Sequence, residues 1–274
     1  MPLNFDNYAP YRPYVDAGQF SYSIEGALQL LEMTKEIAAA QFQTAHKGTP
    51  FYVMGFAAFA SHDYPTASLF FDAAVAEDLR NHPGRADSPA LLFMQLDSES
   101  APSLAKPIIE QVSEDLRTLV RDYNGRENSQ ALTLNDVRVN FLRPIIHEPE
   151  PQKRALATAL ISFVGEWRYR RRLIMLFEHG SREPFFLHLF RGCLLFESLL
   201  KAQAKKVLTK STLGEILRND VRTELALTNP DVREIYFNTM VAALTVNMAI
   251  EDAINSTGKA RNTLGHNIVW QRPT

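Results

Sequence analysis

The chain has 274 residues, of which 46% are hydrophobic, and this is ample for one large domain or two ordinary domains with a real core. A net charge of −2 excludes a global attraction to nucleic acid or to an acidic membrane, so any such contact has to depend on a local patch. The single cysteine, Cys193, excludes an intramolecular disulfide framework and fits a reducing compartment.

The first 22 residues are expected to form an extended arm, because Pro10 and Pro13 stand among several tyrosines and discourage a helix. The segment 1–6 lacks the basic and apolar parts of a signal peptide. The most apolar run, 184–200, is interrupted by charged and imidazole side chains, so no unbroken stretch approaches the roughly 18 apolar residues of a membrane span. We therefore expect a soluble cytoplasmic protein.

Residues 23–46 predict an amphipathic helix, because their apolar residues recur at steps of three or four. The stretch that follows resembles a tetratricopeptide unit, with 61–63 as the turn between two antiparallel helices. The small and aromatic positions that carry this resemblance are Gly55, Tyr64, Ala67, Phe71 and Ala74. Such a stack implies either a groove for a peptide or partner, or a helical scaffold, and one recognisable unit favours the scaffold.

Helices are expected to continue after this unit. Ser88 can cap a helix whose first position is Pro89, and apolar residues recur along one side of 107–123. Residues 132–146 are interpreted as a short helix, although 137–141 also alternates as a strand would.

A polar stretch with two prolines, 147–151, is the best candidate for a domain boundary. It divides the chain into a helical, tetratricopeptide-like region with the extended arm, residues 1–147, and a second helical domain, residues 148–274. His147 lacks the second histidine of the zinc-protease pattern, and the other histidines have no ligand spacing. No metal or other cofactor is predicted.

A long helix is expected over 152–179, and it contains a basic and aromatic cluster. The cluster consists of Trp167, Arg168, Tyr169, Arg170, Arg171 and Arg172. These side chains are candidates for contacting RNA phosphates and stacking on bases. In the alternative interpretation, Trp167 packs inward and the arginines form a solvated face, because helical rotation fans them around the helix.

A wide apolar face is expected on the next helix, which begins at Pro184. Its breadth implies central burial or a subunit interface, and Cys193 within it is expected to be a buried, inert thiol. Glu197 is a candidate for orienting a catalytic arginine or histidine. A simple pair with Lys201, four residues later, is the favoured interpretation.

Two further helices are expected toward the carboxyl end. A capping-box pattern begins a short helix over about 213–218. Asn229 and Pro230 begin the longest helix, which runs to about Asn255 and is ended by Gly258.

An arginine and a histidine stand five residues apart after this glycine. A guanidinium presents a planar fork of donors to phosphoryl oxygens, and an imidazole can exchange a proton near neutral pH. A helix start at this place would add backbone N–H groups and the helix dipole to the attraction for a phosphate. Arg261 and His266 are therefore candidates for phosphate chemistry. The candidates for binding the substrate are Lys259, Arg168, Arg170, Arg171 and Arg172.

Arg261 and Asn262 followed by His266 resemble the Arg-Asn-x3-His motif of the HEPN superfamily, and 190–202 resembles the apolar early helix of that family. The resemblance implies an all-α fold and a metal-independent endoribonuclease that cleaves single-stranded RNA through attack by its 2′-hydroxyl. It implies that His266 is the general acid–base group and that Arg261 neutralises the charged phosphorane. Asn262 would orient these two side chains.

The same resemblance implies a role in a toxin or antiviral defence system. It also implies a homodimer, because two copies of the motif usually face each other in the family and this chain has one. The alternative is a non-catalytic helical adaptor, or a nucleotide- or RNA-binding protein with the same fold. The N-terminal helices are candidates for contacting a protein partner or an antitoxin. The predicted architecture is all-α: a helical-repeat-like N-terminal part followed by a HEPN-like bundle.

Overall fold

A computed structural model describes residues 4–5, 12–103, 105–125, 131–146, 151–176, 183–203, 253–254, 256–258 and 260–261. The regular secondary structure within these ranges is helical, without a strand, which confirms the predicted all-α class. The chain divides into two compact units, Met1–Asp115 with Asn135–Glu166, and Leu116–Leu134 with Trp167–Thr274. The predicted boundary at 147 and 148 lies outside the described ranges and stays a prediction.

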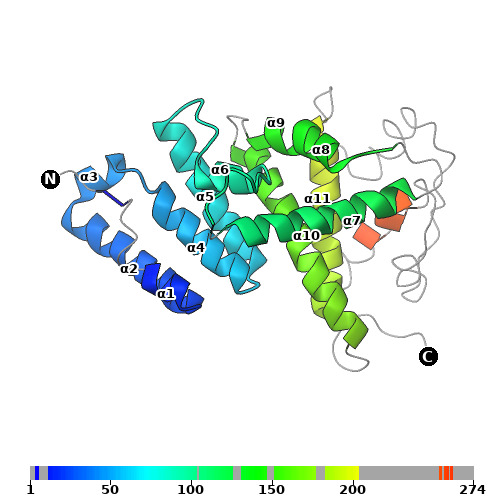
Figure 1. The fold of residues 1–274 in the computed structure, drawn as a ribbon, viewed down its shortest axis with the longest axis horizontal. Helices are drawn as coiled ribbons and strands as arrows, with labels where there is room; N and C mark the ends of the chain where they lie inside the picture. Colours follow the sequence, from blue (N-terminus) through cyan, green and yellow to red (C-terminus); the bar gives the residue numbers. More distant parts are fainter. Residues whose placement is uncertain are drawn as a thin grey trace. The chain divides into compact units, whose positions relative to one another are not determined.

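Figure 1 labels the helices of the described chain along the sequence. In order they are α1 (Arg12–Asp16), α2 (Phe20–Ile37), α3 (Ala39–Thr44), α4 (Gly48–Ala60), α5 (Tyr64–Asn81), α6 (Pro89–Met94), α7 (Lys106–Asn124), α8 (Leu134–Val137), the π-helix η1 (Arg138–Leu142), α9 (Arg143–Ile146), α10 (Pro151–Leu176) and α11 (Glu183–Gln203). None of these helices is long and apolar enough to cross a membrane.

Helix α4 lies at the centre of the first unit, because nearly every side chain in it is apolar or small and most of its residues are buried. A helix that is apolar all round has to be enclosed, and α4 contacts α2, α5 and α6. Phe93 of α6 stacks on Phe71 of α5, with ring centroids 4.1 Å apart, and meets Phe59 of α4 edge-on at 5.6 Å. These rings join three helices in one core.

Helices α4 and α5 form the hairpin that the tetratricopeptide-like pattern predicts. The turn is 61–63, and the Asp63 carboxylate accepts a hydrogen bond from the Thr66 backbone N–H at the start of α5. Gly55 lets the two helices approach closely, since a Cβ there would lie 2.9 Å from the Phe71 ring. The small residues of the pattern on α5, Ala67 and Ala74, are fully buried.

A polar seam joins α5 to the first half of α10 within the first unit. Ser68 of α5 contacts the Ser162 hydroxyl and the Thr158 carbonyl of α10. One turn further along α5, Asp72 pairs with Arg154, with 3.3 Å between Oδ1 and Nε. Burial raises the pKa of Asp72, and the charge of Arg154 and its hydrogen bond only partly oppose this.

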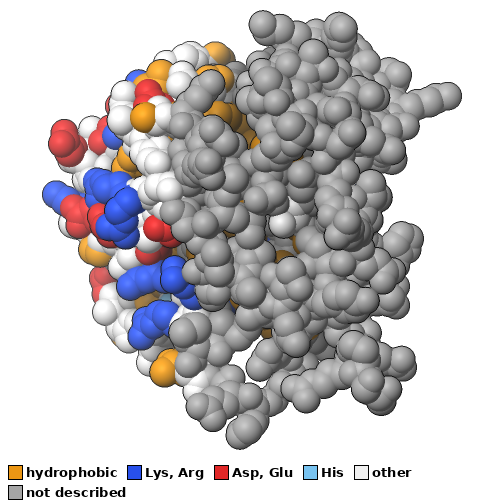
Figure 2. All heavy atoms as spheres, turned by 90° about the vertical axis from the view of Figure 1, so that its right-hand side faces the viewer, with side chains coloured by type: hydrophobic (Ala, Val, Ile, Leu, Met, Phe, Trp, Pro, Cys, Tyr) orange, Lys and Arg blue, Asp and Glu red, His pale blue; other side chains and the backbone are white. Residues whose placement is uncertain are grey.

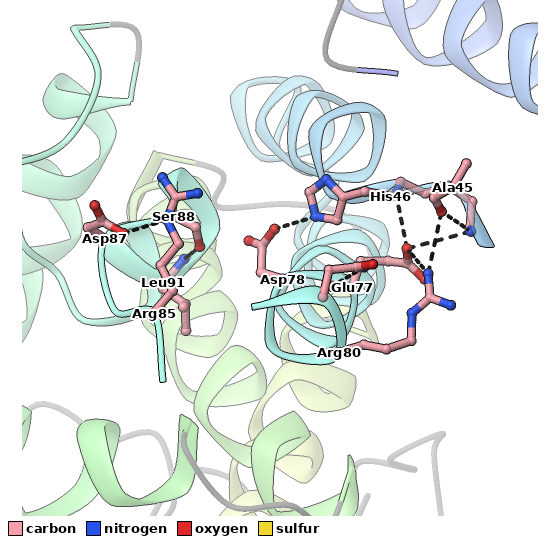
Figure 3. Close-up of polar contacts among 11 residues, drawn as sticks. Ala45, His46, Glu77, Asp78, Arg80, Arg85, Asp87, Ser88 and Leu91 are labelled. Carbon is pink, nitrogen blue, oxygen red and sulfur yellow. Dashed lines mark hydrogen bonds and ion pairs between the residues drawn. The ribbon is translucent and has the colours of Figure 1, made fainter. Parts of the chain in front are cut away.

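Acidic side chains of α5 fasten the connection between α3 and α4 (Figure 3). His46 Nε2 lies 2.8 Å from Asp78 Oδ1. Glu77 accepts a hydrogen bond from the Lys47 backbone N–H and pairs with Arg80 at 2.7 Å. The Lys47 ammonium and the Arg80 guanidinium in turn donate to carbonyl oxygens at and after the end of α3, where a helix leaves them without helical partners. Those carbonyl groups belong to Phe42, Gln43 and Ala45.

The N-terminal segment differs from the predicted extended arm, since Arg12–Asp16 and Phe20–Ile37 are helical. Pro13 stands in the first turn of α1, where its missing N–H breaks no helical hydrogen bond. The single helix expected over 23–46 is also wrong, because the chain turns at Ala38, whose φ is −139°.

Several other local predictions are confirmed. Ser88 caps α6 by accepting a hydrogen bond from the Leu91 backbone N–H, with Pro89 at the first helical position. Residues 137–141, which also alternate as a strand would, are helical, and the π-helical turn covers Arg138–Leu142. The short helix expected at 213–218 and nearly all of the long helix expected at 229–255 lie outside the described residues.

Gly55→Ala should lower the free energy of unfolding by about 1–3 kcal/mol, because the new methyl group meets the buried Phe71 ring, which cannot move away within a packed core. Urea unfolding followed by circular dichroism measures this change. Leu69→Ala on the exposed side of α5 is the control and should change stability little. A Gly55→Ala protein as stable as the wild type would show that α4 and α5 are not in close contact at this point.

Candidate functional site

The second unit has an aromatic core on one side of α11. Phe185, Phe186 and Cys193 of α11 are buried together with Ala260, a residue 67 positions after Cys193 in the sequence. Trp167, Leu189 and Phe190 pack against this cluster with part of their surface exposed. The core therefore brings the short helical segment at residues 260–261 against α11, and places Arg261 beside it.

Glu197 of α11 joins two cations. Its side chain is 8% exposed, and it accepts a hydrogen bond from Lys201 Nζ at 2.6 Å and another from Arg261 Nε at 3.2 Å. Lys201 follows by one helical turn, so that pair is local, whereas Arg261 is 64 residues distant in sequence. A nearly buried carboxylate between two cations is thus the polar centre of this part of the second unit.

The two cations decide the charge state of Glu197. Burial alone would raise the pKa of its carboxyl group, but the Lys201 hydrogen bond and the charges of Lys201 and Arg261 outweigh burial and hold the pKa below its ordinary value. Glu197 is therefore ionised at neutral pH. The carboxylate can compensate only part of the two positive charges, so the group as a whole is cationic.

Cys193 lies one turn before Glu197 on α11 and is buried. Burial raises the pKa of its thiol to about 11, and the nearby Arg261 charge opposes this only in part. A thiol that stays protonated at neutral pH is a poor nucleophile. The structure therefore supports the predicted inert thiol.

Arg261 combines a fixed position with exposure. Its bond to Glu197 uses one of the five N–H donors of the guanidinium, and 32% of the side chain is exposed. A guanidinium held at one edge by a carboxylate can still present its other donors to an oxyanion. This arrangement suits binding of a phosphate or carboxylate.

The remaining residues of the predicted motif lie outside the described part of the chain. These are Lys259, Asn262 and His266, and their roles stay predictions. Of the predicted catalytic residues, the structure therefore describes Arg261 alone.

The arginines of α10 surround the helix. Arg168, Arg171 and Arg172 are exposed and Arg170 is half-buried. Trp167 packs against Phe185 and stacks on the ring of His188, with centroids 5.8 Å apart, so it points inward as the alternative interpretation of this cluster expects. In the view of Figure 2, Lys and Arg side chains on the described surface lie beside Asp and Glu side chains. Whether the four arginines bind RNA stays a prediction.

Sequence reasoning weighed Glu197 but did not place it among the site residues. The sequence leaves open a local pair with Lys201 and an orienting contact with a catalytic arginine or histidine, and the structure shows Glu197 bonded to both Lys201 and Arg261. The feature of the sequence that points to Glu197 is its position as a carboxylate on an otherwise apolar face of α11.

No group of three or more His, Cys, Asp or Glu side chains that could hold a metal ion occurs within the ranges given above. No family model, curated protein or solved structure matches the chain. The chemistry of the candidate site therefore has to be argued from Glu197, Lys201 and Arg261 themselves.

Glu197→Gln should lower the free energy of unfolding at pH 7 by about 1–2 kcal/mol, since both cationic partners are partly exposed and screened. The folded-state pKa of Glu197 lies below the ordinary value of 4.5, so its stabilisation is present above pH 4.5 and is lost as the pH falls through the lower folded-state pKa. Urea unfolding of both proteins at pH 7 and near pH 4 should show the difference shrinking in acid. Glu32→Gln, at an exposed position on α2, is the control. If the difference in unfolding free energy between the two proteins grew in acid, the lowered folded-state pKa of Glu197 would be wrong.

Proposed function

We propose that the chain is a metal-independent endoribonuclease of the HEPN type, which cleaves single-stranded RNA through attack by the 2′-hydroxyl. The observation that supports this most directly is the ion pair between Glu197 and Arg261. It holds the arginine of the Arg-Asn-x3-His motif against α11, with a third of the side chain exposed. The bond leaves the other guanidinium donors available for the oxygens of a scissile phosphate.

The mechanism follows from the chemistry of a phosphodiester. The 2′-hydroxyl loses its proton as its oxygen attacks the adjacent phosphorus, and the bond to the 5′-oxygen breaks as that oxygen takes up a proton. The products are a 2′,3′-cyclic phosphate and a free 5′-hydroxyl. His266 exchanges a proton with the attacking or the leaving oxygen, and Arg261 stabilises the negative charge on the pentacoordinate phosphorane.

Glu197 acts in this proposal as a positioning residue. By accepting from Nε, it fixes the rotation of the guanidinium about its long side chain, so Arg261 need not be ordered when the substrate binds. Lys201 shares the same carboxylate and adds a second positive charge for the backbone of the RNA. Twofold pairing of two chains would supply a second copy of the motif.

Arg261→Ala should lower the rate of RNA cleavage by about 10²–10³-fold, and His266→Ala by about 10²–10⁴-fold, because each removes stabilisation of the reacting phosphate or its protons. The measurement uses a labelled single-stranded RNA with purified protein in excess chelator. Arg85→Ala is the matched control, because Arg85 is also paired with a carboxylate, Asp87, on the surface of the other unit. It should leave the rate unchanged.

Two outcomes would remove the proposal. Cleavage that survives both Arg261→Ala and His266→Ala would show that a contaminating nuclease or another site cuts the RNA. RNA that stays intact at all protein concentrations, with binding that Arg261→Ala weakens, would favour the adaptor or RNA-binding alternative. A DNA strand of the same sequence should stay intact, because it lacks the attacking hydroxyl.

Glu197→Gln should lower kcat about tenfold while KM changes less, because the amide keeps the shape of the carboxylate but no longer fixes a charged guanidinium before the transition state. Single-turnover and steady-state cleavage by the two proteins measure this split. The pH profile of the remaining activity should keep its shape, since the titrating group is His266. A changed profile would instead assign Glu197 to proton transfer.

A further inference from the structure

Helix α2 carries exposed apolar side chains beside its buried face. Its inner face, Ser23, Ala27, Leu31 and Thr34, is buried, and α2 packs on α4. Large apolar side chains nevertheless stand elsewhere on the same helix: Tyr22 is 66% exposed, Met33 53% and Ile37 78%. We call these three residues the α2 outer stripe.

The three residues share one sector of the helix surface, with Met33 and Ile37 one turn apart and Tyr22 roughly 16 Å away along the axis. At 100° per residue, Tyr22, Met33 and Ile37 fall within about 60° of one another around the helix. Tyr14 of α1, itself 40% exposed, extends the surface, because its ring lies 6.1 Å from that of Tyr22. Single exposed apolar residues are ordinary, but two exposed apolar pairs in one sector, Tyr14 with Tyr22 and Met33 with Ile37, offer a long contact to a helical partner.

An acidic edge borders the α2 outer stripe on one side. Glu25, Glu32 and Glu36 recur at seven and four residues, so they share a line along the helix, next to the stripe and on the side away from the core. All three are exposed. Lys35 is the one basic residue of α2 and lies beyond this edge.

The charge pattern selects the class of partner. An acidic edge repels RNA phosphates and anionic lipid headgroups, so neither nucleic acid nor an anionic membrane fits the surface. An antiparallel twofold pairing of two α2 helices would place acidic edge against acidic edge, which disfavours a second copy. A partner helix with an apolar face and a border of Lys or Arg would fill the stripe and pair with the three carboxylates.

We propose that the α2 outer stripe, with its acidic edge, is a docking site for an amphipathic helix of a partner protein whose apolar face is bordered by basic residues. The partner helix lies along α2, with its leucine-type side chains over Tyr22, Met33 and Ile37. Its basic side chains reach Glu25, Glu32 and Glu36. This site lies in the first unit and does not depend on RNA cleavage.

The test uses two synthetic helical peptides as long as α2, 18 residues. Both carry leucines at heptad a and d positions; one has lysines along one edge, and the other has glutamates there. Fluorescence anisotropy with the full chain should show saturable binding of the lysine peptide, at least about tenfold tighter than the glutamate peptide. Glu32→Lys combined with Glu36→Lys should reverse this preference.

Met33→Ser combined with Ile37→Ser should weaken binding of the lysine peptide by about tenfold or more, since the two substitutions remove two of the three apolar side chains of the α2 outer stripe. Leu69→Ser, at a position 66% exposed on α5, is the matched control and should bind as the wild type does. Circular dichroism melting of each variant checks that the fold is retained, which is expected at exposed positions.

Three results would overturn the proposal. One is the absence of saturable binding of the lysine peptide. Another is equal binding of both peptides that the double charge change leaves equal, which would indicate a non-specific apolar surface. The third is self-association of the chain that Met33→Ser with Ile37→Ser abolishes, because the occupant would then be a second copy.

Discussion

The described part of the second unit depends on compensation of one buried carboxylate. A carboxylate removed from water without partners costs several kcal/mol, whereas an exposed ion pair contributes at most about 1 kcal/mol. The side chain of Glu197 is 8% exposed, whereas those of Arg261 and Lys201 are 32% and 40% exposed. The carboxylate therefore loses most of its hydration, and the two cations keep part of theirs. Removing either cation leaves a charge that is still buried. Because the buried carboxylate needs its cationic partners more than they need it, the bond to Glu197 holds Arg261 against α11.

The first unit is organised by the opposite requirement, which is the enclosure of an apolar helix. Helix α4 has no polar face, so its neighbours have to cover it on every side, and close approach is possible because Gly55 stands under Phe71. Gly165 has the same role on α10, where a Cβ would lie 2.8 Å from Phe59. Small residues at both crossings let the rings of Phe59 and Phe71 fill the space that larger side chains would otherwise occupy.

Local patterns predicted most of the helices, because a helix and its caps are specified by residues within a few positions. Asp63 and Ser88 are examples, since each accepts from the backbone N–H three residues later. The break at Ala38 could not be predicted in this way, because no proline or glycine marks it. The sequence offers Glu197 as an orienting residue for a catalytic arginine or histidine, but local patterns cannot establish the pair of Glu197 with Arg261. Its partners are 64 residues apart, and only the folded core at Phe186 and Ala260 brings them together.

The connection around His46 holds the C-terminal end of α3 against α5. Helix α2 ends at Ile37, and α3 and the turn after it are held by Lys47 and Arg80, both of which contact Glu77 of α5. Gly48 permits this closeness, since a Cβ there would lie 2.5 Å from Asp78 Oδ1 and 2.6 Å from His46 Nε2. Helix α2 packs along its inner face on α4 and contacts α3, whose C-terminal end is bonded to Lys47 and Arg80, so the outer stripe belongs to a packed helix. A surface held in place before binding loses less conformational entropy when a partner docks, and this favours α2 as a recognition element.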